Sequence, residues 1–492
     1  MVRRRIRLGR GDAAAAAGLA GTFDRIRAEL GVPERFPPEV LAAAQEAARA
    51  PHPDRADLTA MPFVTVDPPG STDLDQALHL SRAPGGGYRV EYAIADVPAF
   101  LVPGGPVDVE AMRRGLTLYA PDRRIPLHPE VLSEGAASLL PNQPRPAFVW
   151  RFTLDGAGRV TTVDVVRALV RSRARLDYGQ VQAAADAVPS DRPLPDLQAD
   201  PLTEQAVLLR EIGVRRLALE VARGGASLPM PEQVVSVSDG GYRLGLRPAL
   251  PAEDWNAQLS LMTGMAAADL MLGGRVGLLR TMPAPDPALV DRYRRQVDAL
   301  GVRWPAEQPY GDFLRGLDRS DGRQLAAIHE AVALFRGAGY TPLDGELPPL
   351  RTHAAVAAPY AHVTAPLRRL VDRFGLVVCS AIGSGALVPD WARAALPGLP
   401  AAMRSADRIA CALERACVDA VEAVVLAARV GQTFPAVVVD VGRDGGTSGG
   451  TVQLPEPAVT AGCSGPLALG DALQVRLVEA DPGTGRVRFA PA

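Results

Sequence analysis

The stretch of residues 63–78 constrains the fold more than any other part of this 492-residue chain. It begins with a run of apolar and β-branched residues, typical of a buried strand, that leads directly into Asp67. Pro68-Pro69-Gly70 must then form a turn, because proline continues neither a strand ladder nor a helix. The chain returns through Asp73 and Asp75, whose side chains share a direction if that segment is extended. The segment therefore predicts a strand, a tight turn and a return that together gather three carboxylates.

Three carboxylates gathered in this way repel one another unless a cation is present. No arginine or histidine lies between Asp67 and Ala77 to relieve that repulsion. Hard divalent ions such as Mg²⁺ bind oxygen ligands and leave open positions for phosphate. The alternative is a polar loop whose aspartates only make turn and capping hydrogen bonds, as aspartates in Pro/Gly-rich loops commonly do. These residues alone leave both interpretations open.

Further motifs follow this segment in order along the chain. They lie at residues 92–97, 118–129, 176–178 and 360–372. Together with residues 63–78, and in this order, they resemble the signature of the ribonuclease II/R (RNB) family of exoribonucleases. The resemblance implies an α+β fold, in which an RNB catalytic domain surrounds a mixed sheet with helices and contains a channel for RNA.

A chain of 492 residues is too long for one hydrophobic core, and its patterns predict four parts. The parts are a short helical N-terminal segment, an RNB-like catalytic domain, a helical connection and an OB-fold RNA-binding barrel, over residues 1–57, 58–385, 386–430 and 431–492. The N-terminal segment, with helices expected at 13–32 and 38–50, is too small for the paired cold-shock barrels of many family members. The last part shows four short strands separated by Gly, Pro and Asp turns, and a five-stranded barrel needs one more.

Composition limits the sites that the chain can offer. The net charge is −2 and all 53 basic residues are arginines, so lysine is excluded as a nucleophile or phosphate ligand. A site for nucleic acid must then be a local, arginine-lined channel. The four cysteines show neither a zinc spacing nor a disulfide framework, which favours free thiols in a reducing cytoplasm. No strongly apolar run is long enough to span a membrane, and a cytoplasmic monomer is expected.

The resemblance also implies roles for the aspartates. Asp67, Asp73 and Asp75 match three of the family's four metal-site aspartates, and the fourth position falls on Gln76. An amide carries no charge, and one lost charge interaction at roughly 4 Å is worth on the order of 1–4 kcal/mol. We therefore expect two Mg²⁺ ions, the second held more weakly than the first.

Arg368 matches the family's phosphate-contacting arginine. A planar guanidinium can bind a phosphate through two hydrogen bonds and offset charge that develops in the transition state. Pro366 is placed to open a helix at its first turn, which would put Arg368 and Arg369 near a helix N-terminus that favours anions. Either arginine can instead pair with Asp372. The family's serine in this motif is Ala365 here.

Four further positions match or approach functional positions of the family. Tyr119 matches the aromatic residue that stacks on the terminal nucleotide, and Tyr178 matches an aromatic residue at the ribose-selecting position. Core packing is the alternative for both tyrosines. Relatives carry a glutamate near the position of Ser260, and Glu414 matches a second acidic residue near the RNA terminus, although a glutamate on a helix surface would look the same.

The resemblance implies a Mg²⁺-dependent hydrolytic 3′-to-5′ exoribonuclease that degrades single-stranded RNA processively to nucleoside 5′-monophosphates. Its catalytic residues would be Asp73, Asp75 and Arg368, and its RNA contacts Tyr119, Tyr178, Arg368, Arg369, Gln76 and Glu414. One alternative, motivated by Gln76, is a catalytically weakened RNA-binding protein of the same fold. The other is an unrelated metal-dependent phosphoesterase for small esters, against which the arginine motif and the C-terminal barrel argue.

Overall fold

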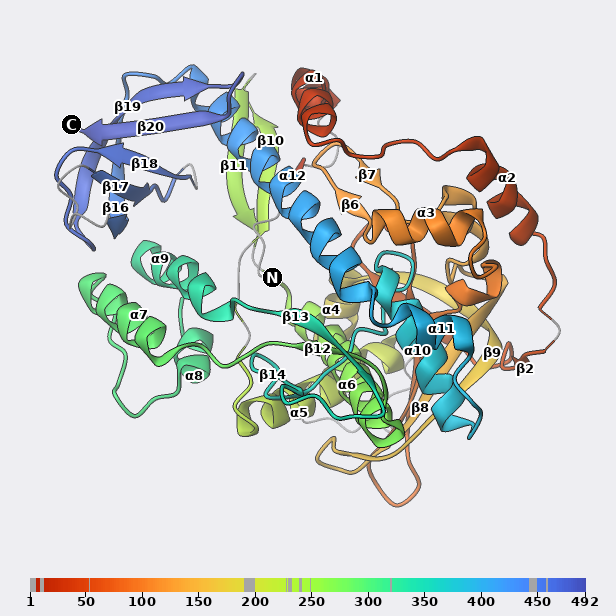
Figure 1. The fold of residues 1–492 in the computed structure, drawn as a ribbon. Helices are drawn as coiled ribbons and strands as arrows, with labels where there is room; N and C mark the ends of the chain where they lie inside the picture. Colours follow the sequence, from red (N-terminus) through yellow and green to blue (C-terminus); the bar gives the residue numbers. More distant parts are fainter. Residues whose placement is uncertain are drawn as a thin grey trace.

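The structure is a computed structural model that describes residues 6–8, 13–52, 54–189, 200–226, 228, 232–238, 241–247, 249–318, 321–441, 449–456 and 459–492. A curved central sheet is surrounded by helices, and a separate C-terminal barrel stands to one side of it (Figure 1). The long helix α12 (Leu399–Ala427) runs from the helices beside the sheet to that barrel.

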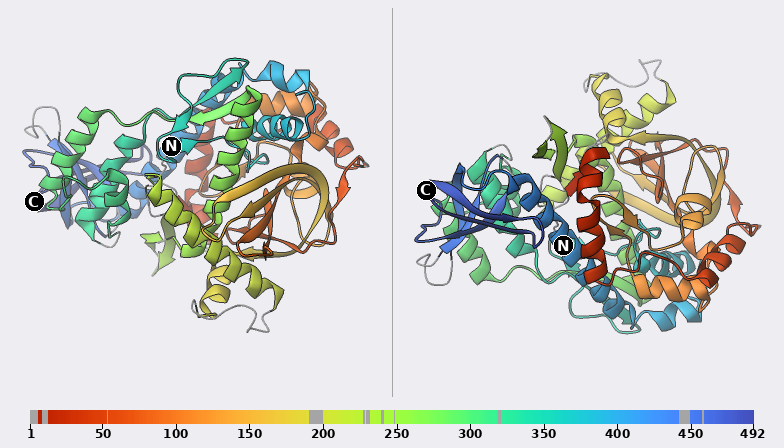
Figure 2. Two further views of the ribbon diagram at one scale, coloured as in Figure 1. Left: turned by 90° about the horizontal axis from the view of Figure 1, so that it is seen from below. Right: turned by 90° about the horizontal axis from the view of Figure 1, so that it is seen from above.

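The central sheet has the strand order β2-β9-β3-β4-β5-β8 and closes on itself through an extra pairing of β8 with β9. The closed form is visible in the left view of Figure 2. Its strands are β2 (Ala56–Asp57), β3 (Phe63–Asp67), β4 (Gln76–Arg82), β5 (Tyr88–Ala95), β8 (Pro144–Leu154) and β9 (Val160–Asp177). Closure depends on the length of β9, which pairs with β8 as far as Arg171 and with β3 from Ser172 onward. β8 and β9 form a hairpin, as the strand-forming residues on either side of Asp155-Gly156-Ala157-Gly158 predict, and its second strand extends to Asp177.

Helices cover the sheet on several sides. They are α1 (Ala13–Glu29), α2 (Pro38–Ala47), α3 (Pro106–Arg114), α4 (Tyr178–Asp186), α5 (Pro201–Ala222), α6 (Pro251–Gly274), α10 (Leu370–Gly383) and α11 (Asp390–Ala395), with short turns of helix at Val97–Phe100 and Val131–Ala136. Helices α2, α3, α5 and α6 have proline in the first turn, where its fixed φ suits the helix and its missing N–H is not needed. The Asp200 carboxylate caps α5 by accepting from the backbone N–H groups of Leu202 and Thr203.

Smaller pairings complete the part of the chain before the barrel. They are β6 (Leu118–Tyr119) with β7 (Arg124–Ile125), β12 (Val276–Thr281) with β13 (Gly339–Asp344), β14 (Thr352–His353) with β15 (Ala358–Pro359), and β1 (Ile6–Leu8) with β10 (Glu232–Ser238) and β11 (Gly241–Arg247). A helical module of α7 (Pro287–Ala299), α8 (Tyr310–Arg315), α9 (Gly322–Glu330) and the turn Ala331–Phe335 shares a core with Val439 of the barrel.

The C-terminal part is a closed barrel, as the sequence predicts. Its order is β16-β17-β18-β20-β19, formed by β16 (Thr433–Val441), β17 (Gly449–Gln453), β18 (Thr460–Ser464), β19 (Ala472–Asp481) and β20 (Arg486–Pro491). The strand missing from the sequence prediction is β18, whose small residues Thr460-Ala461-Gly462-Cys463-Ser464 give little strand signal. Phe434 and Phe489 pack edge to face at 6.1 Å inside the barrel and are buried, so neither offers a ring face to a base.

Two expectations about the whole chain can be compared with the described residues. The four cysteines are free thiols, of which Cys379, Cys417 and Cys463 are buried. Within the part of the chain that the structure describes, no helix combines the length and the apolar character that crossing a membrane requires.

Candidate functional site

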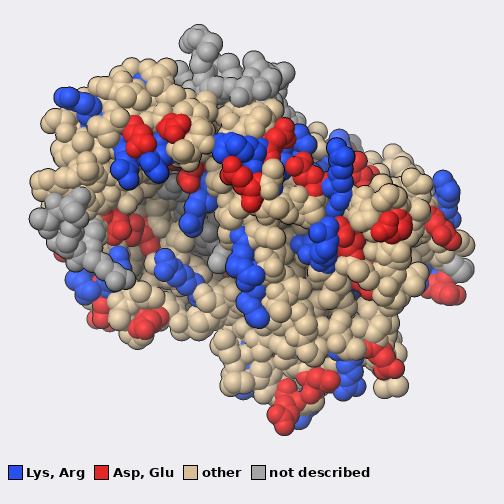
Figure 3. Space-filling model, turned by 45° about the horizontal axis from the view of Figure 1, so that its top comes forward, with Lys and Arg blue, Asp and Glu red and all other residues tan. Residues whose placement is uncertain are grey.

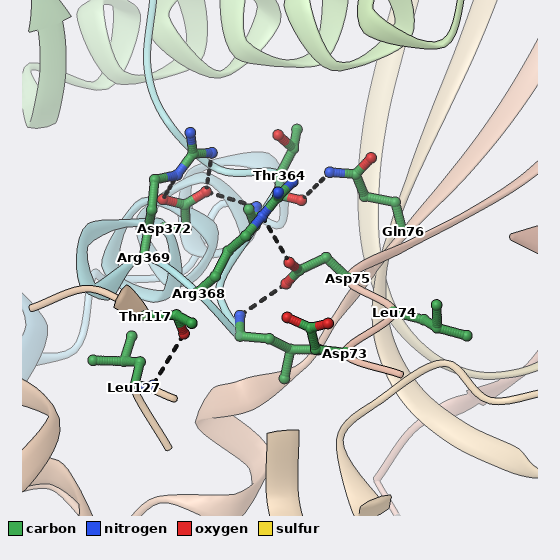
Figure 4. A network of polar contacts seen from close by, with 12 residues as sticks. Asp73, Leu74, Asp75, Gln76, Thr117, Leu127, Thr364, Arg368, Arg369 and Asp372 are labelled. Carbon is green, nitrogen blue, oxygen red and sulfur yellow. Dashed lines mark hydrogen bonds and ion pairs between the residues drawn. The ribbon is translucent and has the colours of Figure 1, made fainter. Parts of the chain in front are cut away.

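Asp75 lies buried where two distant segments of the chain meet. It is 2% exposed; its Oδ1 accepts a hydrogen bond from the backbone N–H of Leu367 at 2.8 Å, and its Oδ2 lies 3.2 Å from Nε of Arg368 (Figure 4). Its backbone carbonyl accepts from the N–H of Ala95 at 2.9 Å, which ties the loop to the end of β5. The aspartate motif and the arginine motif, almost three hundred residues apart, therefore share one site.

Asp67 ends β3 at the position that pairs with Asp177 of β9. Its Oδ2 is buried and has no hydrogen-bond partner among the described residues. Burial raises the pKa of Asp67 to about 7 and that of Asp75 to about 8; the charge of Asp73 adds to both shifts and Arg368 opposes them. The positive charge of Arg368 thus does not outweigh the burial of these two carboxyl groups.

A divalent cation would satisfy these features. Buried carboxylates with raised pKa values and an unpaired oxygen are the donor set that Mg²⁺ binds. As the side chains stand, the described residues include no group of three or more His, Cys, Asp or Glu that could hold a metal ion. The assignment of Asp67, Asp73 and Asp75 as ligands therefore stays a prediction.

Asp73 is paired with an arginine that the sequence analysis missed. Nη1 of Arg124 lies 2.5 Å from Oδ1 of Asp73, and Nη2 of Arg124 lies 2.7 Å from Oε1 of Glu134. Thr72 joins the group by donating to Oε2 of Glu134 at 2.7 Å and by accepting from Arg124. Arg124 falls inside the motif at residues 118–129, and the pairing of β6 with β7 sets it opposite Tyr119. Only that pairing turns it toward the aspartates, so the sequence carried no direct signal.

Gln76 points away from the aspartates into a network of neutral hydrogen bonds. Its Nε2 donates to the carbonyl of Thr364 at 2.6 Å, as Figure 4 shows, and its Oε1 accepts from the hydroxyl of Tyr92 at 2.6 Å. Ser260, the position where relatives carry a glutamate, lies in the same network, 2.9 Å from the Tyr92 hydroxyl and 3.4 Å from Oε1 of Gln76. Gln76 and Ser260, near which the resemblance places a glutamate of the relatives, are thus neighbours in space.

The prediction that Pro366 opens a helix is wrong. Helix α10 begins at Leu370, and Arg369 has extended dihedrals of φ −134° and ψ 124°. The physical reason is Asp372, whose carboxylate accepts from the N–H of Ala365 at 2.7 Å and so holds the preceding residues in a turn. Of the two pairings left open, Arg369 takes Asp372 at 2.7 Å, and Arg368 is left facing Asp75 (Figure 4).

The remaining candidate residues differ in their distance from the cluster. Tyr119 is 51% exposed and its hydroxyl lies 3.5 Å from Oδ2 of Asp73, so its ring stands open beside the aspartates. Tyr178, the first residue of α4, is half-buried; burial first, and then the charge of Asp67, raise the pKa of its phenol. Glu414 lies on α12 near Cys417. The predicted contacts of these three residues with RNA stay predictions.

The charges on the surface are mixed. On the face drawn in Figure 3, basic and acidic side chains alternate, and all the basic ones are arginines because the chain has no lysine. This agrees with the expectation that a site for nucleic acid must be local.

Comparison with known proteins gives two family matches. The RNB domain model matches residues 55–376, and the model of the RNase II-type exonuclease C-terminal S1 domain matches residues 432–492. The chain is 27% identical to Ribonuclease R of Aquifex aeolicus over 83% of this chain and 58% of that protein. It is 28% identical to Ribonuclease R of Escherichia coli over 69% of this chain and 42% of that protein. It is 29% identical to the exosome complex exonuclease RRP44 homolog A of Arabidopsis thaliana over 66% of this chain and 35% of that protein. The chain thus spans between 35% and 58% of the length of these curated relatives.

Solved structures share the fold. The apo form of Mycoplasma genitalium RNase R superposes with a TM-score of 0.82 over 96% of this chain and 78% of that one, at 19% sequence identity. Yeast Ssd1, described as a pseudonuclease, gives a TM-score of 0.67 over 88% of this chain and 52% of that one, at 17% identity. At these identities the likeness concerns the fold alone.

Proposed function

The chain belongs to the RNB family, and on that basis we propose that it is a hydrolytic exoribonuclease that removes nucleotides from the 3′ end of single-stranded RNA. The observation that carries the proposal is the junction of Asp75 with Leu367 and Arg368. It joins a buried carboxylate to an arginine that is 44% exposed, and so sets an acidic and a basic group at one accessible point. Hydrolysis of a phosphodiester needs both a site for water and a cation for phosphate.

Arg368 would bind the phosphate to be cleaved. Its Nε is held by Asp75 at 3.2 Å, which leaves the terminal nitrogens of the guanidinium for two phosphate oxygens. Asp75 would orient the attacking water and position Arg368 at the same time. Arg369, tied to Asp372, would keep the loop that carries Arg368 in place.

Mg²⁺ held by Asp67, Asp73 and Asp75 would supply an activated water and offset the charge of the transition state. The chain's own residues set the direction of cleavage. The exposed ring of Tyr119 beside Asp73 can stack on a base at the 3′ end without sequence preference. Tyr178, beside Asp67, can contact the 2′-hydroxyl that separates RNA from DNA. Nucleoside 5′-monophosphates released one at a time are the expected products.

The C-terminal barrel over residues 431–492 would add a second contact with RNA. Because Phe434 and Phe489 are in its core, this contact must rest on backbone phosphates and exposed arginines such as Arg476, Arg486 and Arg488. The Mycoplasma genitalium enzyme has been solved with ribose-methylated single-stranded RNA and with double-stranded RNA, which supports RNA as the ligand class. The free cysteines suit work in a reducing cytoplasm.

The test uses one single-stranded RNA labelled at either end, incubated with and without Mg²⁺. We expect the 3′ label to be released at once as mononucleotide, while the 5′-labelled strand shortens gradually without internal fragments. Internal fragments from both labels would contradict an exonuclease. Binding of the RNA without release of nucleotide at any Mg²⁺ concentration would favour the alternative of a catalytically weakened RNA-binding protein.

A further inference from the structure

Two residues at the aspartate cluster have no part in the proposed reaction. One is an arginine that pairs with an aspartate, and the other is an amide where the family has a fourth carboxylate. Arg124 occupies an oxygen of Asp73, and Gln76 stands at the fourth aspartate position. Their contacts bear on how many metal ions the site can hold. The inference rests on the proposed function only in taking the aspartates as the metal site.

The orientation of Gln76 is determined by its neighbours. The Thr364 carbonyl can only accept a hydrogen bond, so the amide nitrogen of Gln76 must face it at 2.6 Å. The amide oxygen then accepts from the Tyr92 hydroxyl at 2.6 Å, and the Ser260 hydroxyl, 2.9 Å from that of Tyr92, lies 3.4 Å from the same oxygen. Tyr92 is 1% exposed, so this network is part of the core. Both ends of the Gln76 amide are therefore hydrogen-bonded to the protein, and the amide brings no negative charge to a metal ion.

Arg124 is held equally firmly. Its guanidinium binds Asp73 and Glu134 at 2.5 and 2.7 Å and also donates to the hydroxyl of Thr72. The side chains of this trio are only 15–27% exposed, which shields the pair from screening by solvent. An arginine does not lose its proton in a protein, so this positive charge is permanent.

The balance of charge then favours a single ion. Arg124 and Arg368 offset two of the four carboxylates of the group, which are Asp67, Asp73, Asp75 and Glu134. The formal charge that is left equals that of one divalent ion with the sign reversed, so one ion neutralises the group. A second ion would add two positive charges and gain no carboxylate ligand from Gln76.

We propose that Arg124 takes the place of the second metal ion, so that this chain binds one divalent cation and not two. The guanidinium neutralises Asp73 permanently and stands ready as a counter-ion for substrate phosphate. This replaces the expectation of a weak second Mg²⁺ with a fixed charge that does not depend on metal concentration.

The test counts ions on the full chain with Mn²⁺, whose free fraction is measured by electron paramagnetic resonance. Titrations are run with and without AMP, which brings a phosphate group but contains no phosphodiester bond for the enzyme to cleave. We expect one Mn²⁺ per chain in both titrations. Arg124→Gln should bind Mn²⁺ about tenfold or more tightly, because a positive charge beside the ion is removed. The double variant Arg124→Gln/Gln76→Asp should bind a second ion with AMP.

Arg123→Gln is the matched control. Arg123 is the next residue of the chain, but it pairs with Asp24, Asp122 and Glu34 and not with Asp73, so Mn²⁺ binding should not change. Two ions per wild-type chain would overturn the proposal, as would unchanged affinity in a folded Arg124→Gln. The wild-type count decides the matter even if that variant fails to fold. One bound ion without release of nucleotide from RNA would contradict the proposed function and leave this inference standing.

Discussion

Replacing Asp75 by asparagine separates the chemistry of the site from its structure. The change keeps the size of the side chain and one carbonyl oxygen, which can still accept from the N–H of Leu367. It removes the carboxyl oxygen that faces Nε of Arg368 at 3.2 Å. The amide NH₂ cannot accept a hydrogen bond, so Arg368 loses the partner that positions it.

The effect on stability follows from the pKa of the carboxyl. Burial raises the pKa of Asp75 from 3.8 to about 8, so at pH 7 the metal-free folded protein must hold a proton that the unfolded chain does not. This costs about 4 kcal/mol at pH 7, and asparagine does not incur it. The lost pairing with Arg368 opposes the gain by roughly 1–3 kcal/mol. Asp75→Asn should therefore stabilise the metal-free protein by about 1–3 kcal/mol.

The direction of the Asp75 pKa shift also determines how the free energy of unfolding depends on pH. Because the folded pKa is above the unfolded one, the free energy of unfolding of the wild type falls as pH rises from about 4 to about 8. Asp75→Asn should show a flatter curve over that window, although Asp67 still contributes. Urea denaturation in EDTA at several pH values measures both effects.

Turnover should respond in the opposite direction. Release of the 3′ label from single-stranded RNA should fall by several orders of magnitude, because the variant loses both the metal ligand and the position of Arg368. RNA affinity, measured by fluorescence anisotropy, should stay nearly unchanged, since most of it comes from arginines and stacked rings. Comparable turnover would remove Asp75 from the mechanism. An equal loss of binding and stability would instead assign it a structural role.

Four further predictions concern other parts of the chain. Tyr178→Phe should narrow the ratio of cleavage rates on RNA and DNA strands of one sequence, and an unchanged ratio would leave Tyr178 as a core residue. Mg²⁺ at one hundred times its Kd should raise the free energy of unfolding by about 2.7 kcal/mol, and a melting temperature equal in EDTA would count against a metal site. Burial raises the pKa of Glu330 to about 7, so the folded protein holds a proton at a pH where the unfolded chain does not. Glu330→Gln should therefore stabilise the protein by about 2–3 kcal/mol at pH 8 and little at pH 4.5. An equal difference in free energy of unfolding between variant and wild type at both pH values would refute this. Arg27 is fully buried against Asp122, and Arg27→Met should cost about 3–5 kcal/mol in urea denaturation, of which a second change, Asp122→Asn, should recover part.

Residues close together in the sequence were enough to predict many of the helices and strands. The helices expected at residues 13–32 and 38–50 and the strand before the aspartate loop are decided by residues close in sequence, and the structure has α1, α2 and β3 there. Strand β18 escaped prediction because small residues carry little strand preference, and its place is decided by pairing with β17 and β20. The helix predicted from Pro366 does not form there. The hydrogen bond from the N–H of Ala365 to the carboxylate of Asp372 outweighs the local preference of proline for the first turn of a helix.

The sequence by itself determined most of the groups at the site, since the motifs name the three aspartates, Gln76 and Arg368 in order, whereas Arg124 and Glu134 carried no such signal. The tertiary structure alone decided how those groups are paired. Arg124 reaches Asp73 because β6 pairs with β7. Gln76 points away from the aspartates because its amide is hydrogen-bonded to Thr364 and Tyr92. Charge and hydrogen bonding act over a few ångströms in space, whatever the separation along the chain. The pairing of charges at the site is therefore a property of the fold.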